Sequence, residues 1–174
     1  MLELKDLIRT IPDFPKPGIE FRDLTTLFLH GEGFRRTISA LAERYARENV
    51  DLVCGVESRG FILGAPLAVE LGKGFVPIRK EGKLPGKTIG VEYTLEYGED
   101  RLEVHADALP AGARVLMMDD LLATGGTMQA ACKLVETVGA RVLSCGFVVE
   151  LVDLQGRAKL PNYDVYSLVT YTGE

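Results

Sequence analysis

Residues 115–127 read VLMMDDLLATGGT, and this stretch decides the fold class of the chain. Its first four residues are apolar, which is typical of a strand buried inside a sheet. Asp119 and Asp120 follow, and after two leucines come small residues with two adjacent glycines, Gly125 and Gly126, before a helical pattern begins. A buried strand, a tight turn and a helix in this order indicate an α/β protein.

The same stretch predicts a site for a ligand that carries a phosphate and a diol. In open α/β sheets, ligands bind beyond the carboxyl ends of the strands, where Asp119 and Asp120 would lie. The glycines let the backbone approach a ligand closely, and the free N–H groups of the following helix favour an anion. The two carboxylates can accept hydrogen bonds from a diol or hold a hydrated divalent cation. The alternative is an acidic turn followed by an ordinary threonine-capped helix.

Apolar strands alternate with amphipathic helices over most of the chain. We expect strands at residues 51–56, 74–78, 114–118, 141–149 and 164–171, and helices at residues 3–10, 33–48, about 60–71 and after Gly126. Residues 12–18 (PDFPKPG) exclude regular structure because they hold three prolines. Period-two alternation in residues 88–104 predicts an antiparallel hairpin. The fold class is therefore α/β, a central and mainly parallel sheet flanked by helices, in one domain spanning residues 1–174.

Charge and composition narrow the classes of function. The chain has 174 residues and a net charge of −5, which argues against a nucleic-acid partner. No apolar run is long enough to span a bilayer, so we expect no membrane partner and a cytoplasmic location. Residues 79–87 (RKEGKLPGK) depart from this acidic background, since they carry four basic residues and one acid. We expect an anion to bind there, although a solvated charged loop would have the same composition.

Two further patterns argue against other kinds of site. Residues 55–60 have the glycine spacing of a P-loop, but Phe61 and Ile62 stand where that motif needs lysine and a hydroxyl residue. The three cysteines are odd in number, widely spaced and set in apolar segments, so we expect buried free thiols. These cysteines are Cys54, Cys132 and Cys145.

The stretch 115–127 resembles the signature of the type I phosphoribosyltransferases: four apolar residues, two acids and a small-residue phosphate loop. That resemblance implies binding of 5-phosphoribosyl 1-pyrophosphate (PRPP), with Mg2+ carried by PRPP or pyrophosphate and no metal site built by the protein alone. It assigns the ribose hydroxyls to Asp119 and Asp120. It assigns the 5-phosphate to the loop Ala123, Thr124, Gly125, Gly126 and Thr127. It also implies an N-terminal hood, a flexible hairpin loop and a homodimer.

Four further segments extend the resemblance across nearly the whole chain: residues 14–27, 55–68, 79–88 and 95–100. Arg59 follows a buried strand directly, and the resemblance gives it a catalytic contact to pyrophosphate; a surface salt bridge is the alternative. Pyrophosphate leaves readily only when its charge is neutralised, and a closing basic loop does this while excluding water. The residues assigned to that task are Arg79, Lys80 and Lys83. Residues 150–160 also resemble the family, and we interpret them as structural.

The expected acceptor is a purine, and the resemblance is closest to the members that use adenine. Phe21 and Leu121 would sandwich the ring, with backbone groups around Arg22 recognising its edge. Enzymes for 6-oxopurines carry an acid where this chain has Ala123, so the proton must come from elsewhere. Glu96 is the candidate for donating to N7 or relaying a proton at N9, and Tyr97 would lie beside it in the loop over the active site.

The expected reaction is therefore purine salvage, in which adenine and PRPP give AMP and pyrophosphate. Two alternatives remain from the sequence. One is an enzyme for hypoxanthine, guanine or xanthine, and the other is a regulator that senses PRPP without turnover. The second is disfavoured because the basic loop and the Glu96 hairpin serve turnover, and because no room is left for a DNA-binding domain before Met118.

Overall fold

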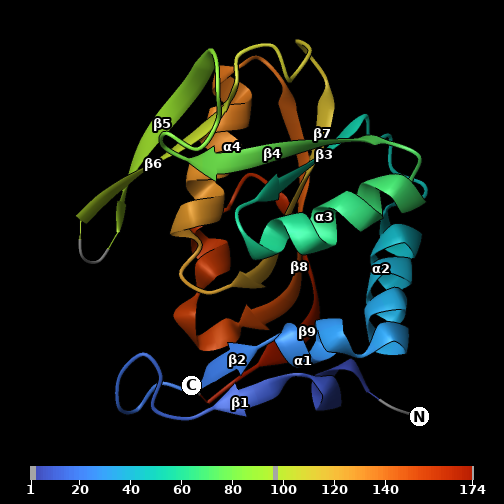
Figure 1. The fold of residues 1–174 in the computed structure, drawn as a ribbon, viewed down its shortest axis with the longest axis vertical. Helices are drawn as coiled ribbons and strands as arrows, with labels where there is room; N and C mark the ends of the chain where they lie inside the picture. Colours follow the sequence, from blue (N-terminus) through green and yellow to red (C-terminus); the bar gives the residue numbers. More distant parts are fainter. Residues whose placement is uncertain (1–2, 96–97, 174) are drawn as a thin grey trace.

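The computed structural model of the chain describes residues 3–95 and 98–173, and its centre is one seven-stranded mixed sheet (Figure 1). The strands lie in the order β5-β6-β4-β3-β7-β8-β9. Five neighbours pair in parallel, and they are β4 (Gly74–Lys80), β3 (Leu52–Val56), β7 (Arg114–Leu122), β8 (Arg141–Leu151) and β9 (Asp164–Tyr171). The predicted α/β class with a mainly parallel sheet is confirmed.

Alternation along β7 divides the apolar core between the two faces of the sheet. Val115 and Met117 belong to one buried cluster together with α4 (Gly126–Thr137). Leu116 and Met118 belong to the other, together with α2 (Gly31–Tyr45) and α3 (Arg59–Glu70). Successive side chains of a strand point to opposite faces, so a continuous apolar run fills both clusters. Helices therefore cover both faces, and the sheet edge that carries the carboxyl ends of β3 and β7 stays open.

The predicted hairpin is formed by β5 (Thr88–Leu95) and β6 (Gly98–His105), which pair antiparallel along their whole length. It joins the parallel sheet through a short antiparallel contact in which Arg79 and Lys80 face Glu103 and Leu102. In Figure 1 the hairpin projects to the left of the sheet. Its tip, with the predicted residues Glu96 and Tyr97, lies outside the described residues.

The N-terminal region differs most from expectation. The helix predicted for residues 3–10 is wrong: a 3-10 turn at Leu4–Leu7 is followed by the strand β1 (Arg9–Ile11). This strand pairs antiparallel with β2 (Phe21–Asp23), and α1 (Thr25–Leu29) follows. Pairing with β2 overrides the local helical pattern, because a short helix gains most of its stability from tertiary contacts. The irregular structure predicted for residues 12–18 is confirmed.

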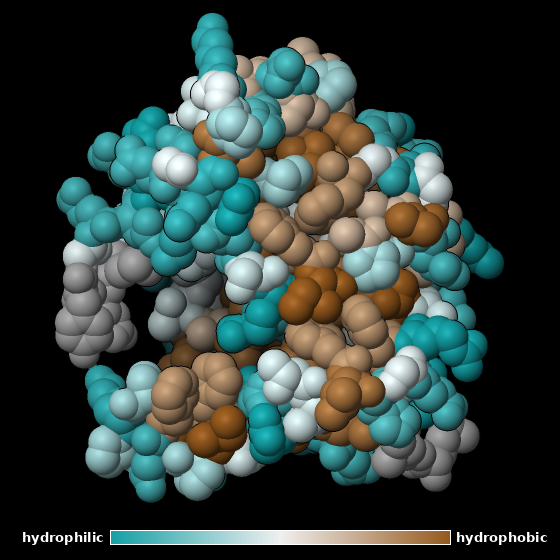
Figure 2. Space-filling view, viewed as in Figure 1, coloured by the Kyte–Doolittle hydropathy of each residue, from teal (hydrophilic) through white to brown (hydrophobic). Residues whose placement is uncertain are grey.

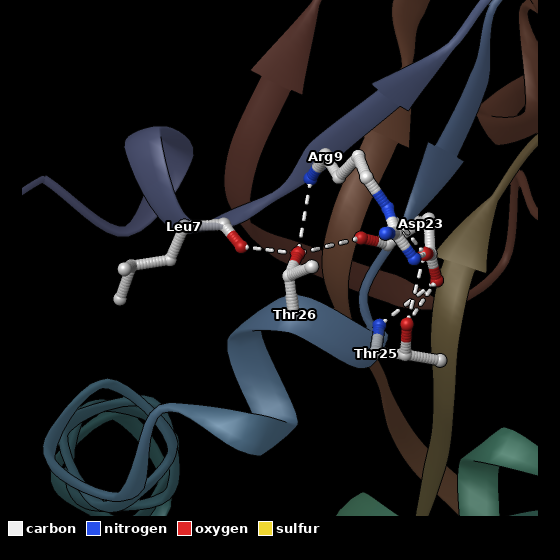
Figure 3. A network of polar contacts seen from close by, with 5 residues as sticks. All are labelled: Leu7, Arg9, Asp23, Thr25 and Thr26. Carbon is white, nitrogen blue, oxygen red and sulfur yellow. Dashed lines mark hydrogen bonds and ion pairs between the residues drawn. The ribbon is translucent and has the colours of Figure 1, made fainter.

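The N-terminal hood consists of β1, β2 and the segment between them, and one polar cluster holds it together (Figure 3). The buried carboxylate of Asp23 accepts hydrogen bonds from Arg9, at 3.0 Å from Nε, and from the backbone N–H of Thr25 at 3.0 Å. The hydroxyl of Thr26 donates to the carbonyl of Leu7 at 2.7 Å and accepts from the N–H of Arg9. A buried carboxylate is tolerated when it is paired and hydrogen-bonded in this way. The cluster therefore fixes β1, β2 and the start of α1 relative to one another.

The cysteines are buried free thiols, as predicted. Burial raises the pKa of Cys54 to about 12. Cys132 and Cys145 are 13 positions apart in the chain, and their Sγ atoms lie 3.5 Å from each other between α4 and β8, a contact that the sequence does not predict. Among the described residues, no helix has the length and apolarity that crossing a membrane requires.

Candidate active site

A cavity of about 430 Å3 opens at the carboxyl ends of β3 and β7. This is the edge at which ligands bind in open α/β sheets. Most of the predicted site residues line it, and they are Arg59, Lys80, Asp119, Asp120, Leu121, Ala123, Thr124, Gly125, Gly126 and Thr127. The chain thus brings together, in one cavity, residues that are up to 68 positions apart in sequence (Arg59 to Thr127).

The predicted phosphate loop is shorter than the sequence suggested. The strand β7 continues to Leu122 and α4 begins at Gly126, so only residues 123–125 form the turn. Gly125 has a φ of +81°, a left-handed conformation that favours glycine. The first N–H groups of α4 have no carbonyl partner within the helix and lie at the cavity, next to the positive end of the helix dipole. This arrangement can bind a phosphate.

The two adjacent acids lie within β7, near its carboxyl end, and not after it. The predicted strand end at Met118 is therefore wrong. Asp120 is almost fully buried and pairs with the guanidinium of Arg59. Asp119 accepts a hydrogen bond from the N–H of Asp120 at 2.9 Å. Burial, followed by the neighbouring carboxylate of Asp120, raises the pKa of Asp119 well above its ordinary value. The pair therefore presents unequal carboxylates to the cavity.

Arg59 occupies the first turn of α3, directly after a cis peptide bond between Glu57 and Ser58. The Arg59 side chain is 43 % exposed and spans from Asp120 towards Phe21, whose ring centroid lies 5.8 Å from the guanidinium carbon. Its salt bridge is thus made inside the cavity and not on the outer surface.

The predicted basic loop begins later than expected, since Arg79 and Lys80 are the last residues of β4. Lys80 lines the cavity, and its Nζ lies 2.9 Å from Oδ2 of Asp100. That hydrogen bond is the largest cause of the raised pKa of Lys80. Arg79 instead donates from Nε to Glu57 at 3.1 Å and from Nη1 to the carbonyl of Lys83 at 3.2 Å. Neither Arg79 nor Lys83 lines the cavity in this structure.

Of the residues assigned to the base, Leu121 lines the cavity and Phe21 does not. Phe21, on β2, lies against Arg59 of the cavity lining and packs edge-on against Phe14 at 5.2 Å between ring centroids. The side chain of Arg22 turns away to Glu20 at 2.7 Å and to the ring of Tyr171 at 4.2 Å. Only the backbone of Arg22 therefore remains for the predicted contact to the base.

Sequence reasoning missed several cavity residues, namely Val56, Ser58, Tyr93, Leu102, Met128 and Phe147. Tyr93 is the most informative of them. It lies on β5, and its hydroxyl donates to Asp100 at 3.3 Å. Burial, followed by the charge of Asp100, raises the pKa of Tyr93. Alternation in the hairpin would have placed Tyr93 on the same face as the buried Val91, which was the available signal.

The acids of the cavity can share a divalent cation with a ligand but do not surround one by themselves. Among the residues 3–95 and 98–173, no three His, Cys, Asp or Glu side chains gather at metal-binding distance. Mg2+ is commonly held by one or two carboxylates together with the phosphates of a substrate. The pair Asp119 and Asp120 fits that arrangement, in which the ligand supplies most of the oxygen atoms.

Comparison with known proteins agrees with this geometry. The family model for the phosphoribosyl transferase domain matches residues 26–172. The chain is 56 % identical over 170 residues to an adenine phosphoribosyltransferase of Roseiflexus castenholzii, covering 98 % of this chain and 99 % of that protein. The chain belongs to the adenine phosphoribosyltransferase family.

Solved structures of the adenine phosphoribosyltransferase family share the fold. That of Thermoanaerobacter pseudethanolicus superposes with a TM-score of 0.94 at 51 % identity, covering 97 % of this chain and 98 % of that one. The Saccharomyces cerevisiae enzyme, complexed with adenine and an imino-altritol bisphosphate, gives 0.90 at 44 % identity, covering 95 % and 96 %. The Trypanosoma brucei enzyme, in complex with AMP, pyrophosphate and ribose-5-phosphate, gives 0.88 at 29 % identity, covering 96 % and 78 %.

Proposed function

We propose that this chain transfers the 5-phosphoribosyl group from PRPP to adenine, giving AMP and pyrophosphate in purine salvage. The observation that carries the proposal is that the predicted phosphate loop, the acidic pair and Arg59 line the same cavity at the strand ends. A nitrogen of adenine forms a bond to C1 of the ribose while the bond from C1 to the pyrophosphate oxygen breaks. The full-length relatives named for this activity support the same reaction.

The phosphoribosyl half of the donor occupies the part of the cavity between β7 and α4. The N–H groups of residues 123–127 and the hydroxyls of Thr124 and Thr127 bind the 5-phosphate. Asp119 and Asp120 accept hydrogen bonds from the ribose hydroxyls, which holds C1 in place for attack. Asp119 and Asp120 could also share a Mg2+ ion carried with PRPP, which would supply positive charge to the departing pyrophosphate.

We propose that Arg59 and Lys80 hold the pyrophosphate. Both line the cavity, and both are paired with carboxylates, Asp120 and Asp100 respectively. A binding anion would share or replace these partners, and the two cations would then stabilise the charge that develops as the C1–O bond breaks. Arg79 and Lys83 belong to the same basic segment, and we propose that movement of residues 79–87 brings their side chains to the pyrophosphate.

Adenine binds between the hood and the phosphate loop. Phe21 and Leu121 hold its two faces, and backbone groups near Arg22 contact its edge. Glu96 moves the proton of the base, at N7 or N9, while Tyr97 covers the site. Ala123 offers no acid to a 6-oxopurine, which favours adenine as the acceptor.

The remaining proposals concern the molecule as a whole. The chain forms a single domain over residues 1–174 and acts in the cytoplasm, a reducing compartment in which three free thiols persist. It forms a homodimer through the face that carries α3. Ile62 and Val69 of this helix are 42 % and 80 % exposed, and Figure 2 shows apolar side chains gathered near the middle of that face. Exposed apolar patches of this kind mark interaction surfaces.

A direct assay tests the proposed reaction. The protein is incubated with PRPP and Mg2+ and, in turn, with adenine, hypoxanthine, guanine or xanthine, and pyrophosphate release is followed. We expect release with adenine far above that with the other bases. Faster release with hypoxanthine or guanine would transfer the assignment to the 6-oxopurine enzymes.

The proton role of Glu96 needs its own measurement. We expect the substitution Glu96→Gln to slow the chemical step in single-turnover experiments by about 10²–10⁴-fold, the usual contribution of general acid–base catalysis. Binding of PRPP should change little, because Glu96 is assigned to the base. An unchanged single-turnover rate would remove Glu96 from the mechanism.

A further inference from the structure

The turn that follows β8 presses against the back of the phosphate loop. A methyl group placed on Gly156 would lie 2.3 Å from the carbonyl oxygen of Ala123 and 2.8 Å from the side chain of Leu122. In the opposite direction, a methyl group on Gly125 would lie 2.4 Å from the carbonyl oxygen of Gly156. The two backbone segments are therefore in direct contact, with no room for a side chain on either side.

This turn is firmly attached to the sheet. The 3-10 segment Gly156–Lys159 begins after Gln155, which has a φ of +52°. Arg157 binds Glu150 through two hydrogen bonds, 2.6 Å from Nε to Oε1 and 2.7 Å from Nη2 to Oε2. Ser167 donates to the same carboxylate at 2.6 Å. A two-pronged Arg–carboxylate pair fixes orientation as well as distance, so the turn is held to β8 and β9.

The burial of Glu150 adds to the rigidity of its pair with Arg157. Glu150 is 5 % exposed, and the hydrogen bond from Arg157 is the largest cause of its lowered pKa. The third nitrogen of the guanidinium, Nη1, donates to the carbonyl of Val165 at 2.7 Å. A displacement of the turn would break several buried or half-buried hydrogen bonds at once. The other side of the phosphate loop faces the open cavity. A clash between the two segments is therefore relieved by movement of the loop and not of the turn.

We propose that Gly156 is a positioning residue for the 5-phosphate subsite, with the pair of Glu150 and Arg157 as its anchor. This inference rests on the proposed function and deepens it. Segment 150–160 was interpreted from sequence as structural only, but it forms the rear wall of the loop that binds the phosphate. Any side chain at Gly156 displaces Ala123 and Gly125, and with them the N–H groups whose hydrogen bonds require donor–acceptor distances near 3 Å.

The test compares two glycine substitutions and two probes. Gly156→Ala is the test variant. Gly31→Ala is its matched control, since a methyl group at Gly31 meets no atom within 4 Å. Dissociation constants are measured by calorimetry for ribose 5-phosphate, which needs the phosphate loop, and for pyrophosphate, which is assigned to Arg59 and Lys80. Urea unfolding confirms that each variant is folded.

We expect Gly156→Ala to weaken ribose 5-phosphate at least about tenfold, equivalent to about 1.4 kcal/mol, and to leave pyrophosphate within about twofold. The control should change neither. Equal losses for both probes, or none in a folded variant, would overturn the inference. Should Gly156→Ala fail to fold, Arg157→Lys replaces it: we expect a smaller loss of ribose 5-phosphate affinity alone, and an unchanged ratio of the two constants overturns the inference. Absence of ribose 5-phosphate binding by the unsubstituted protein would instead contradict the proposed function.

Discussion

Asp119 combines an unfavourable environment with a proposed role in binding ribose. Burial and the carboxylate of Asp120 raise its pKa in the folded protein. Above about pH 3.9, the ordinary pKa of aspartate, the unfolded state loses this proton first. The folded state then binds more protons than the unfolded state, so the contribution of Asp119 to the free energy of unfolding falls as pH rises.

Replacing Asp119 with Asn should therefore stabilise the protein in a pH-dependent way. We expect the gain in the free energy of unfolding to be small near pH 4 and to grow towards neutral pH, measured by urea unfolding at several pH values. Activity should move in the opposite direction. Loss of a charged acceptor for a ribose hydroxyl costs about 1.5–3 kcal/mol, or roughly a 10- to 100-fold fall in kcat/KM for PRPP. A gain that does not vary with pH would contradict this account of Asp119.

Replacing Arg59 should affect the use of PRPP far more than the binding of adenine. Replacing it with Ala removes a cation from the proposed pyrophosphate position and leaves the buried Asp120 without its partner. We expect kcat/KM for PRPP to fall about 10- to 100-fold, because hydrogen bonds to charged groups contribute about 1.5–3 kcal/mol. The KM for adenine should stay within about twofold, and Arg35→Ala, on the exposed side of α2, provides the control. Equal changes in both KM values would argue against the pyrophosphate role.

The hairpin formed by β5 and β6 places an acid beside a cation of the site. The pKa of Asp100 is lowered, and the hydrogen bond from Lys80 is the largest cause. This pair is half exposed, so its contribution to stability is at most about 1 kcal/mol. Its larger effect is electrostatic, since the carboxylate of Asp100 competes with pyrophosphate for the same ammonium group.

Replacing Asp100 with Asn should strengthen binding of pyrophosphate a few-fold at low ionic strength, because Lys80 no longer has a competing anion. The gain should shrink as salt is added, since the site is partly open to solvent. Glu99→Gln removes the same charge from an exposed neighbouring position of the hairpin and serves as the control. Weaker pyrophosphate binding in the Asp100 variant would show that the carboxylate orients Lys80 instead of competing for it.

At the level of elements, hydrophobic pattern predicted long segments well and short ones poorly. The apolar runs of β3, β8 and β9 and the helical stripe of α2 were visible because each repeats its pattern several times. The strands β1 and β2 have three residues each, too few for alternation to be recognised. Strand ends were also misplaced. Backbone pairing extends β7 through Asp119 and Asp120 and extends β4 through Arg79 and Lys80. The polarity of these side chains does not reveal that pairing.

At the scale of the whole molecule, the parts of the candidate site that belong to a local sequence motif could be predicted. The acids lie near the carboxyl end of a strand, and the loop and Arg59 come shortly after strands, so their position at the sheet edge follows from topology. Phe147 and Gly156 reach the cavity or its wall only through the packing of distant segments. A single sequence contains no record of those contacts. The neighbouring thiols of Cys132 and Cys145 were missed for the same reason.

The proposed homodimer can be tested through an exposed apolar side chain. Val69 lies near the end of α3 and is 80 % exposed, so Val69→Glu should leave the folded monomer nearly unchanged. In a twofold interface the same patch meets its own copy, and the substitution would place two like charges close together in a desolvated contact. We therefore expect sedimentation velocity to show the mass of a dimer for the unsubstituted protein and that of a monomer for Val69→Glu. Leu154→Glu, 42 % exposed after β8 and away from α3, is the matched control and should remain dimeric. A dimer that tolerates Val69→Glu but not Leu154→Glu would move the interface to the segment after β8.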